Sequence, residues 1–154
     1  MPEKKTLERA QKDKRAGKSA STQAGEFVKE EMDHIREGKH GARSTKQAIA
    51  IGLSKARRAG VKLGAPKKGK TSAKTRHQAE RDLQKGRTAA KRKPSTKRSR
   101  ATSGALKREG RNAASKRALS QQARSAAKSR SKASRSASAK KAAATRKRKG
   151  RGRK

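Results

Sequence analysis

Histidine and carboxylate side chains are the residues of this chain whose chemistry could support metal binding or acid–base catalysis. The histidines are His34, His40 and His77, and there is no cysteine. None of the histidines has the HExxH spacing of a zinc protease, and no thiolate is available as a ligand. We therefore expect histidines exposed to water and no metal site. The alternative for His40, which lies in a polar link, is contact with phosphate or with nearby carboxylates.

A cluster of acids gives a second chemical possibility. Its members are Glu26, Glu30, Glu31, Asp33 and Glu37. Paired carboxylates can act as a general acid and a general base, but only in a pocket that shifts a pKa. A pair of small helices provides no such pocket, so the sequence predicts a solvated acidic face that balances a basic neighbouring helix.

Residues Gly64 to Thr71 match the phosphate-loop pattern GxxxxGK[ST]. That loop needs a buried strand before it and a helix packed on a sheet after it. Here a basic helix precedes the pattern, and only Val61 and Leu63 are apolar in the intervening residues. We interpret the match as chance in a linker rich in Gly, Lys and Thr. The sequence thus predicts a protein that is not an enzyme and has no cofactor.

Basic side chains are the main chemical signal of the chain. Its 154 residues include 49 Lys and Arg against 11 Asp and Glu, for a formal net charge of +38. Residues 1–37 are nearly balanced, with nine basic and eight acidic residues, whereas residues 38–154 have forty basic and three acidic ones. Such a segment needs counter-charge, and nucleic acid is the commonest dense polyanion in a cell.

The same composition predicts how nucleic acid would be bound. Because Phe27 is the only Phe, Tyr or Trp, bases have no aromatic platform on which to stack. Phosphate contacts would dominate, sequence specificity would be low, and duplex DNA is favoured over RNA. The predicted nucleic-acid-binding residues are Lys46, Lys55, Arg57, Arg58, Lys67, Lys68, Lys70, Lys91, Arg92, Lys93, Lys97, Arg98, Arg100, Lys140, Lys141, Arg146, Lys147, Arg148, Lys149, Arg151, Arg153 and Lys154.

The elements that must position these side chains are helices. Residues 3–16 are typical of a polar helix that Gly17 ends. Residues 22–37 and 44–60 have apolar residues at helical spacing. Ser44 and Gln47 have the spacing of a capping box, and Gly60 followed by Val61 suits a Schellman stop.

The last two helices are expected to form an antiparallel hairpin. One apolar stripe contains Ala24, Val28, Met32 and Ile35, and the facing one contains Ala48, Ile49, Gly52, Leu53, Ala56 and Ala59. Gly52 and Ala56 would let the two backbones approach closely, and the acidic helix would partly neutralise the basic one.

The rest of the chain has the composition of a disordered segment, because hydrophobic residues are few and net charge is high. Short helical stretches there are expected to stop at Gly86 and Gly110. The predicted fold class is therefore all α: a small helical hairpin at about 22–60 with a polar N-terminal helix, followed by a long basic, largely disordered tail with transient helices. The expected domains are 1–21, the polar helix and link; 22–63, the hairpin; and 64–154, the tail.

Residues 24–63 resemble a small bacterial domain family of unknown function. The resemblance is carried by the segment KQAIAIGLSKARRAG, which runs from Lys46 to Gly60. It implies a bacterial source and supplies no catalytic residue. The basic tail, in segments such as SASAKKAAATRKRK, resembles in composition the tails of linker histones and bacterial histone-like proteins.

These observations predict a non-enzymatic, largely sequence-non-specific DNA-binding protein, histone-like and nucleoid-associated, that acts by phosphate neutralisation. The alternatives are an RNA-binding or ribosome-associated basic protein, and a protein-interaction module that its tail tethers to nucleic acid. The hairpin could bind a protein partner or a second copy of the chain. No apolar run could span a membrane and the first residues lack a secretory signal, so we expect a cytoplasmic, nucleoid-associated protein without a membrane partner.

Overall fold

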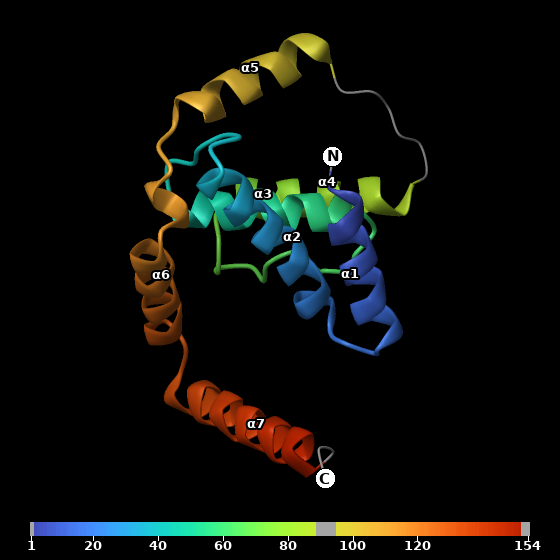
Figure 1. The fold of residues 1–154 in the computed structure, drawn as a ribbon, viewed down its shortest axis with the longest axis vertical. Coiled ribbons are helices and arrows are strands. Elements are labelled where there is room, and N and C mark those ends of the chain that lie inside the picture. The colour runs from blue at the N-terminus through green and yellow to red at the C-terminus, as the bar shows by residue number, and fades with distance from the viewer. Residues whose placement is uncertain (1, 89–94, 152–154) are drawn as a thin grey trace. The chain divides into compact units, whose positions relative to one another are not determined.

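The computed structural model describes residues 2–88 and 95–151 and divides into two compact units, Met1–Ser115 and Lys116–Lys154 (Figure 1). The described elements are helical throughout. In chain order they are α1 (Lys4–Arg15), α2 (Ala20–Arg36), α3 (Thr45–Arg58), α4 (Ala73–Arg87), α5 (Thr96–Arg108), the single 3₁₀ turn η1 (Asn112–Ala114), α6 (Lys116–Lys128) and α7 (Lys132–Arg151). No described helix is long and apolar enough to cross a membrane.

The ends of α3 follow from its flanking residues. The Ser44 hydroxyl accepts a hydrogen bond from the backbone N–H of Gln47, 3.2 Å away, and so caps the first turn. After the last turn, Gly60 takes a φ of 90°, which glycine adopts without steric cost. The Val61 N–H then bonds to the Ala56 carbonyl at 3.1 Å, as in a Schellman motif. The predicted start and stop of this helix are confirmed.

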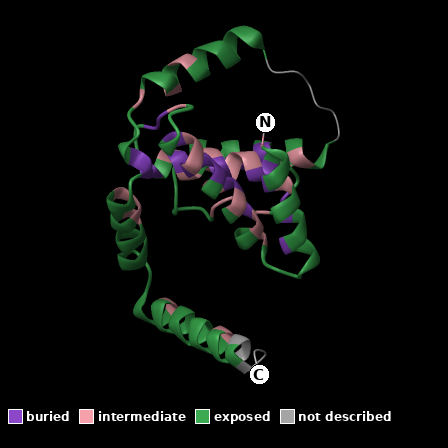
Figure 2. Cartoon of the chain, in the orientation of Figure 1, coloured by how far each residue is buried: buried purple, intermediate pink, exposed green. Residues whose placement is uncertain are grey.

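Helices α2 and α3 pack against each other as a hairpin. A Cβ added at Gly52 would lie 2.7 Å from the Val28 Cα, so the predicted close approach of the two backbones is present. Met32 and Ile35 of α2 are buried, as are Ala48 and Ala56 of α3 (Figure 2).

One core residue was not predicted from the apolar stripes. Phe27 is 1% exposed and lies in a cluster that α1, α2, α3 and the chain after α3 share. The buried members are Ala10, Ala24, Phe27, Ala56 and Val61, with Leu7, Ala20, Leu53 and Leu63 packed against them. Helix α1 is therefore part of the core, because Leu7 and Ala10 cover the side of the hairpin where Phe27 lies.

The first unit also includes α4, which packs on α3. Asp82 is 1% exposed and its Oδ2 accepts a hydrogen bond of 2.6 Å from the Ser54 hydroxyl. A Cβ added at Gly86 would lie 2.0 Å from the Arg57 carbonyl oxygen. The helix expected to stop at Gly86 ends one residue later, at Arg87, and Gly86 lies in its last turn, where it allows the backbone to touch the end of α3.

The last turn of α5 and the residues after it attach to the link between α2 and α3. The Gly41 N–H donates to the Leu106 carbonyl at 2.9 Å, and the Ala42 N–H donates to the Gly110 carbonyl at 3.1 Å. The Thr45 hydroxyl donates to the Ala113 carbonyl at 2.7 Å, and Ala113 and Ala114 are buried.

The predicted small hairpin with a long, largely disordered tail is therefore wrong. Residues 73–87 and 106–114 fold onto the hairpin, and residues 116–151 are mostly helical. Small residues and backbone hydrogen bonds make these contacts, so the low hydrophobicity of the segment did not prevent them. Helices α6 and α7 have no fully buried residue among those described (Figure 2), and their Ala, Lys and Arg residues favour helix by intrinsic propensity.

A pair of glycine substitutions tests the packing of α2 on α3. Gly52→Ala should lower the free energy of unfolding by about 2–3 kcal/mol, because the new methyl group meets the backbone of Val28. Gly25→Ala on α2 is the matched control: no atom lies within 4 Å of its Cβ position, so the change should stabilise the protein by about 0.5–1 kcal/mol through helix propensity. Denaturant unfolding followed by circular dichroism measures both. Equal effects would contradict the packing.

Candidate nucleic-acid interface and buried charge cluster

The second unit presents basic side chains with no acid among them. Residues 116–154 contain sixteen Lys and Arg and no Asp or Glu. Of the predicted contacts on α7, Lys140, Lys141, Arg146 and Lys147 are exposed. The backbone of Arg148, Lys149 and Arg151 is helical, but their side chains lie outside the described part, as do Arg153 and Lys154 altogether.

Further exposed cations lie in the first unit. The loop between α3 and α4 carries Lys67, Lys68 and Lys70, all exposed. This loop contains the sequence that matches the phosphate-loop pattern, and the described residues before it form a helix and a turn, not a strand. Helix α5 carries Lys97, Arg98 and Arg100, also exposed. The predicted contacts Lys91, Arg92 and Lys93 lie outside the described residues.

The four predicted contacts on α3 differ in their exposure and in their partners. Lys46 is exposed, and its side chain makes no hydrogen bond or ion pair with another described residue. Arg57 is buried: its guanidinium donates to the Leu63 carbonyl at 3.1 Å and to the Gly64 carbonyl at 3.3 Å. Loss of hydration lowers the pKa of Arg57, and the nearby Asp82 carboxylate partly offsets this.

The other two cations of α3 form ion pairs inside the unit. Arg58 donates to the Ser54 hydroxyl at 2.8 Å and lies 3.5 Å from the buried Asp82 carboxylate. Lys55 Nζ lies 2.6 Å from Glu31 Oε2 and 3.7 Å from Glu30 Oε1. Three of the four cations on this helix therefore hold the fold together. The sequence contained one signal for this, since acids crowd the helix that faces them.

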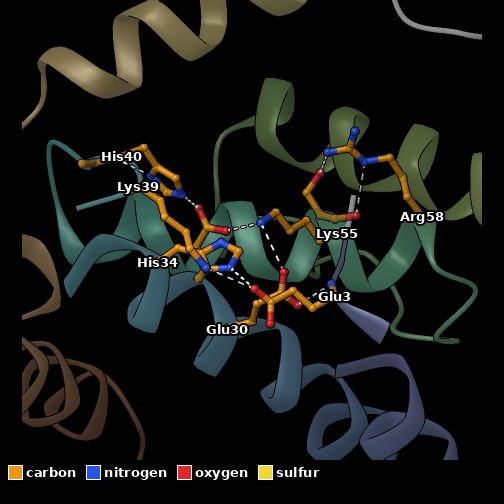
Figure 3. Close-up of polar contacts among 10 residues, drawn as sticks. Glu3, Glu30, His34, Lys39, His40, Lys55 and Arg58 are labelled. Atoms are coloured by element: carbon orange, nitrogen blue, oxygen red, sulfur yellow. Dashed lines mark hydrogen bonds and ion pairs between the residues drawn. The ribbon is translucent and has the colours of Figure 1, made fainter. Parts of the chain in front are cut away.

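Glu31 is the centre of a buried charge cluster, since it contacts both His40 and Lys55, which are labelled in Figure 3. Its side chain is 1% exposed, and its Oε1 lies 3.2 Å from Nε2 of His40. Neither this contact nor the Lys55 contact has hydrogen-bond geometry, so Oε2 is held by its ion pair with Lys55, and Oε1 lies against the His40 ring without a hydrogen bond. On its other side, His40 Nδ1 donates to the Gly41 carbonyl at 3.0 Å.

A second group of charges surrounds His34 beside this cluster. His34 Nε2 lies 2.9 Å from Glu3 Oε1, which Lys39 Nζ also contacts at 3.2 Å. The hydrogen bond from His34, followed by that from Lys39, lowers the pKa of Glu3. The pKa of Lys39 is raised in turn by its contacts with Glu37 and Glu3. His34 and Glu30 also line a small polar hollow between α1 and α2.

Two expectations about these side chains need correction. The side chains of His34 and His40 are only 14% and 17% exposed, so they are not solvated; His77 on α4 is exposed, as expected. Glu30 and Glu31 are buried instead of lying on a solvated face. Their burial follows from charge: they face Lys55, whose ammonium group balances them. The alternative for His40, contact with carboxylates of α2, is confirmed.

Substitutions of two lysines on α3 test the ion pairs that Lys55 forms with the buried carboxylates of Glu30 and Glu31. Lys55→Ala should lower the free energy of unfolding by roughly 2–4 kcal/mol, because it leaves two buried carboxylates without their cation. Lys46→Ala removes an exposed lysine from the same helix and should change stability by less than about 0.5 kcal/mol. Urea unfolding of both variants at neutral pH gives the comparison. A loss at Lys55 no larger than that at Lys46 would rule out a structural role for the pair.

Part of this chain is similar to a protein family of unknown function. Residues 11–69 match the family of unknown function DUF6496. The match includes α2, α3 and the buried charge cluster, and it ends before α4. No curated protein and no solved structure matches the chain. The expected resemblance of residues 24–63 to an uncharacterised domain family is thus supported, and the match does not extend to the basic residues after position 69.

Proposed function

We propose that this protein is a non-enzymatic nucleic-acid-binding protein that neutralises phosphates with little regard to sequence, with duplex DNA as the preferred partner. The observation that carries the proposal is the second unit, in which sixteen cations and no acid occupy 39 residues. The described cations of α6 and α7 are exposed. A surface of one sign attracts a polyanion and releases its condensed counterions on contact.

The dimensions of α7 fit this role. Its 20 residues extend about 30 Å, and a DNA duplex of that length carries roughly 18 phosphate charges. The helix contains nine Lys and Arg in its sequence. Its charge could therefore offset about half of those phosphates.

Low sequence specificity is supported by the contacts of the four cations on α3, which are the candidate side chains for base recognition. Lys55, Arg57 and Arg58 are engaged within the first unit, although the Arg58 side chain stays 52% exposed, and of the four predicted contacts of α3 only Lys46 has no side-chain partner among the described residues. Phe27, the one Phe, Tyr or Trp of the chain, is in the core. Stacking on unpaired bases, the usual basis for reading single-stranded RNA, would thus lack an aromatic platform.

Salt and sequence dependence test the mechanism. Log affinity for a duplex should fall linearly with log salt concentration, by about 0.9 per phosphate neutralised, so ten contacts give a slope of about −9. Two unrelated duplexes of equal length should bind within a few-fold of each other. Fluorescence anisotropy at several salt concentrations, with structured RNA as a competitor, measures both. A slope near −2 or a hundredfold sequence preference would contradict phosphate neutralisation, and tighter binding of the RNA would favour an RNA-binding protein.

Two full-length variants separate charge from helical structure in α7. Replacement of Lys140, Lys141, Arg146 and Lys147 by Gln should make the salt slope shallower by roughly 3–4 and weaken binding to every duplex. The control, Ala142→Gly with Ala144→Gly, keeps every charge and costs helix stability by about 1 kcal/mol per site. It should lower the helical circular dichroism but change affinity only a few-fold. Equal losses of affinity would mean that a defined helix surface, not charge, is recognised.

A further inference from the structure

We propose that Glu31, His34 and His40 bind a divalent transition-metal ion, with zinc as the best candidate. This site is separate from the basic surface and goes beyond the function proposed above. One ligand atom from each of the three residues lies within 4.8 Å of the others. Imidazole nitrogen and carboxylate oxygen are both ordinary zinc ligands. The three residues come from α2 and from the link after it, so a bound ion would join two segments.

The distances require only a small closure. Ligand atoms that share one zinc ion at about 2.1 Å lie roughly 3.4 Å apart in a tetrahedral site. The pair formed by Glu31 Oε1 and His40 Nε2 is already at 3.2 Å. His34, near the end of α2, would complete the set by bringing its ligand nitrogen closer by up to about 1.4 Å, from at most 4.8 Å to the roughly 3.4 Å that a tetrahedral site needs.

The partners of His40 indicate why a cation suits this place. The Gly41 carbonyl can only accept, so the Nδ1 atom of His40 must carry the proton of their hydrogen bond. A neutral imidazole then has its lone pair on Nε2, where it faces a carboxylate oxygen that also has only lone pairs to offer. A proton on Nε2 would relieve the repulsion but not form a well-directed hydrogen bond, since the contact lacks that geometry. A metal ion bound to both atoms needs no such alignment.

Neighbouring groups would hold all three ligands in position. Lys55 lies 2.6 Å from Glu31 Oε2, which leaves Oε1 for the ion. Glu3 Oε1 contacts Nε2 of His34 and so leaves Nδ1 of that ring with its lone pair. Carboxylate and carbonyl groups behind ligating histidines are the usual outer contacts of zinc sites. His34 also lines the small polar hollow between α1 and α2, so one of the three ligands borders a space open to solvent.

Titration of the full-length protein with Zn²⁺ tests the proposal directly. Isothermal titration calorimetry in the absence of nucleic acid should show one ion per chain with a dissociation constant in the micromolar range or below. Co²⁺, used as a spectroscopic probe, should produce the visible absorption of a tetrahedral site with nitrogen and oxygen ligands. No stoichiometric binding by the wild-type protein would overturn the proposal.

Variants then locate the site. His40→Ala and Glu31→Gln should each weaken Zn²⁺ binding at least a hundredfold, and zinc should no longer raise the melting temperature. His77→Ala is the matched control, since His77 is exposed on α4, and its affinity should stay within twofold of wild type. His34→Ala serves as a third site variant if the other two lose helical circular dichroism. Unchanged binding in the folded site variants, or an equal loss in His77→Ala, would show that Zn²⁺ binds elsewhere.

Discussion

Internal neutralisation is the constraint on which the fold depends. A chain with a net charge of +38 can become compact only where carboxylates meet its cations, and all eleven of its acids lie in the first unit. Glu31 and Asp82 are the two most deeply buried of them, and each faces a cation of α3: Lys55 pairs with Glu31, and Arg58 with Asp82. Helix α3 therefore has charge partners on both sides, α2 on one and α4 on the other.

This arrangement gives the basic residues two separate roles. Those close to an acid, such as Lys55, are structural, and a substitution there acts through the stability of the first unit. Those without an acid nearby, such as Lys140, remain available to an external polyanion. The unequal distribution of acids along the chain thus decides which cations fold the protein and which can bind, although both kinds look alike in composition.

The sequence allowed the local features to be predicted, but not the contacts between distant segments. Ser44, Gly60 and the apolar stripes of α2 and α3 act within a few residues, so their patterns predicted the hairpin. The docking of α4 and of residues 106–114 depends on Gly41, Gly86 and Ala114, whose role is to be small where backbones touch. Glycine and alanine give no strong hydrophobic pattern in a sequence, so the segment had the composition of a disordered one. The candidate interface on α7 followed from charge alone, whereas the buried roles of Arg57 and Glu31 required the tertiary structure.

The exposure of α7 on all sides has a consequence for motion on a duplex. A helix with one recognition face must keep that face in a groove, and it leaves the groove when it rotates. On α7 the described cations Lys140, Lys141, Arg146 and Lys147 are not confined to one stripe. Rotation about the helix axis replaces one cation by another at the same phosphate, so many orientations have similar energy. In the DNA complex proposed above, such a helix would retain rotational entropy, and the protein could slide along the duplex without breaking all of its contacts at once.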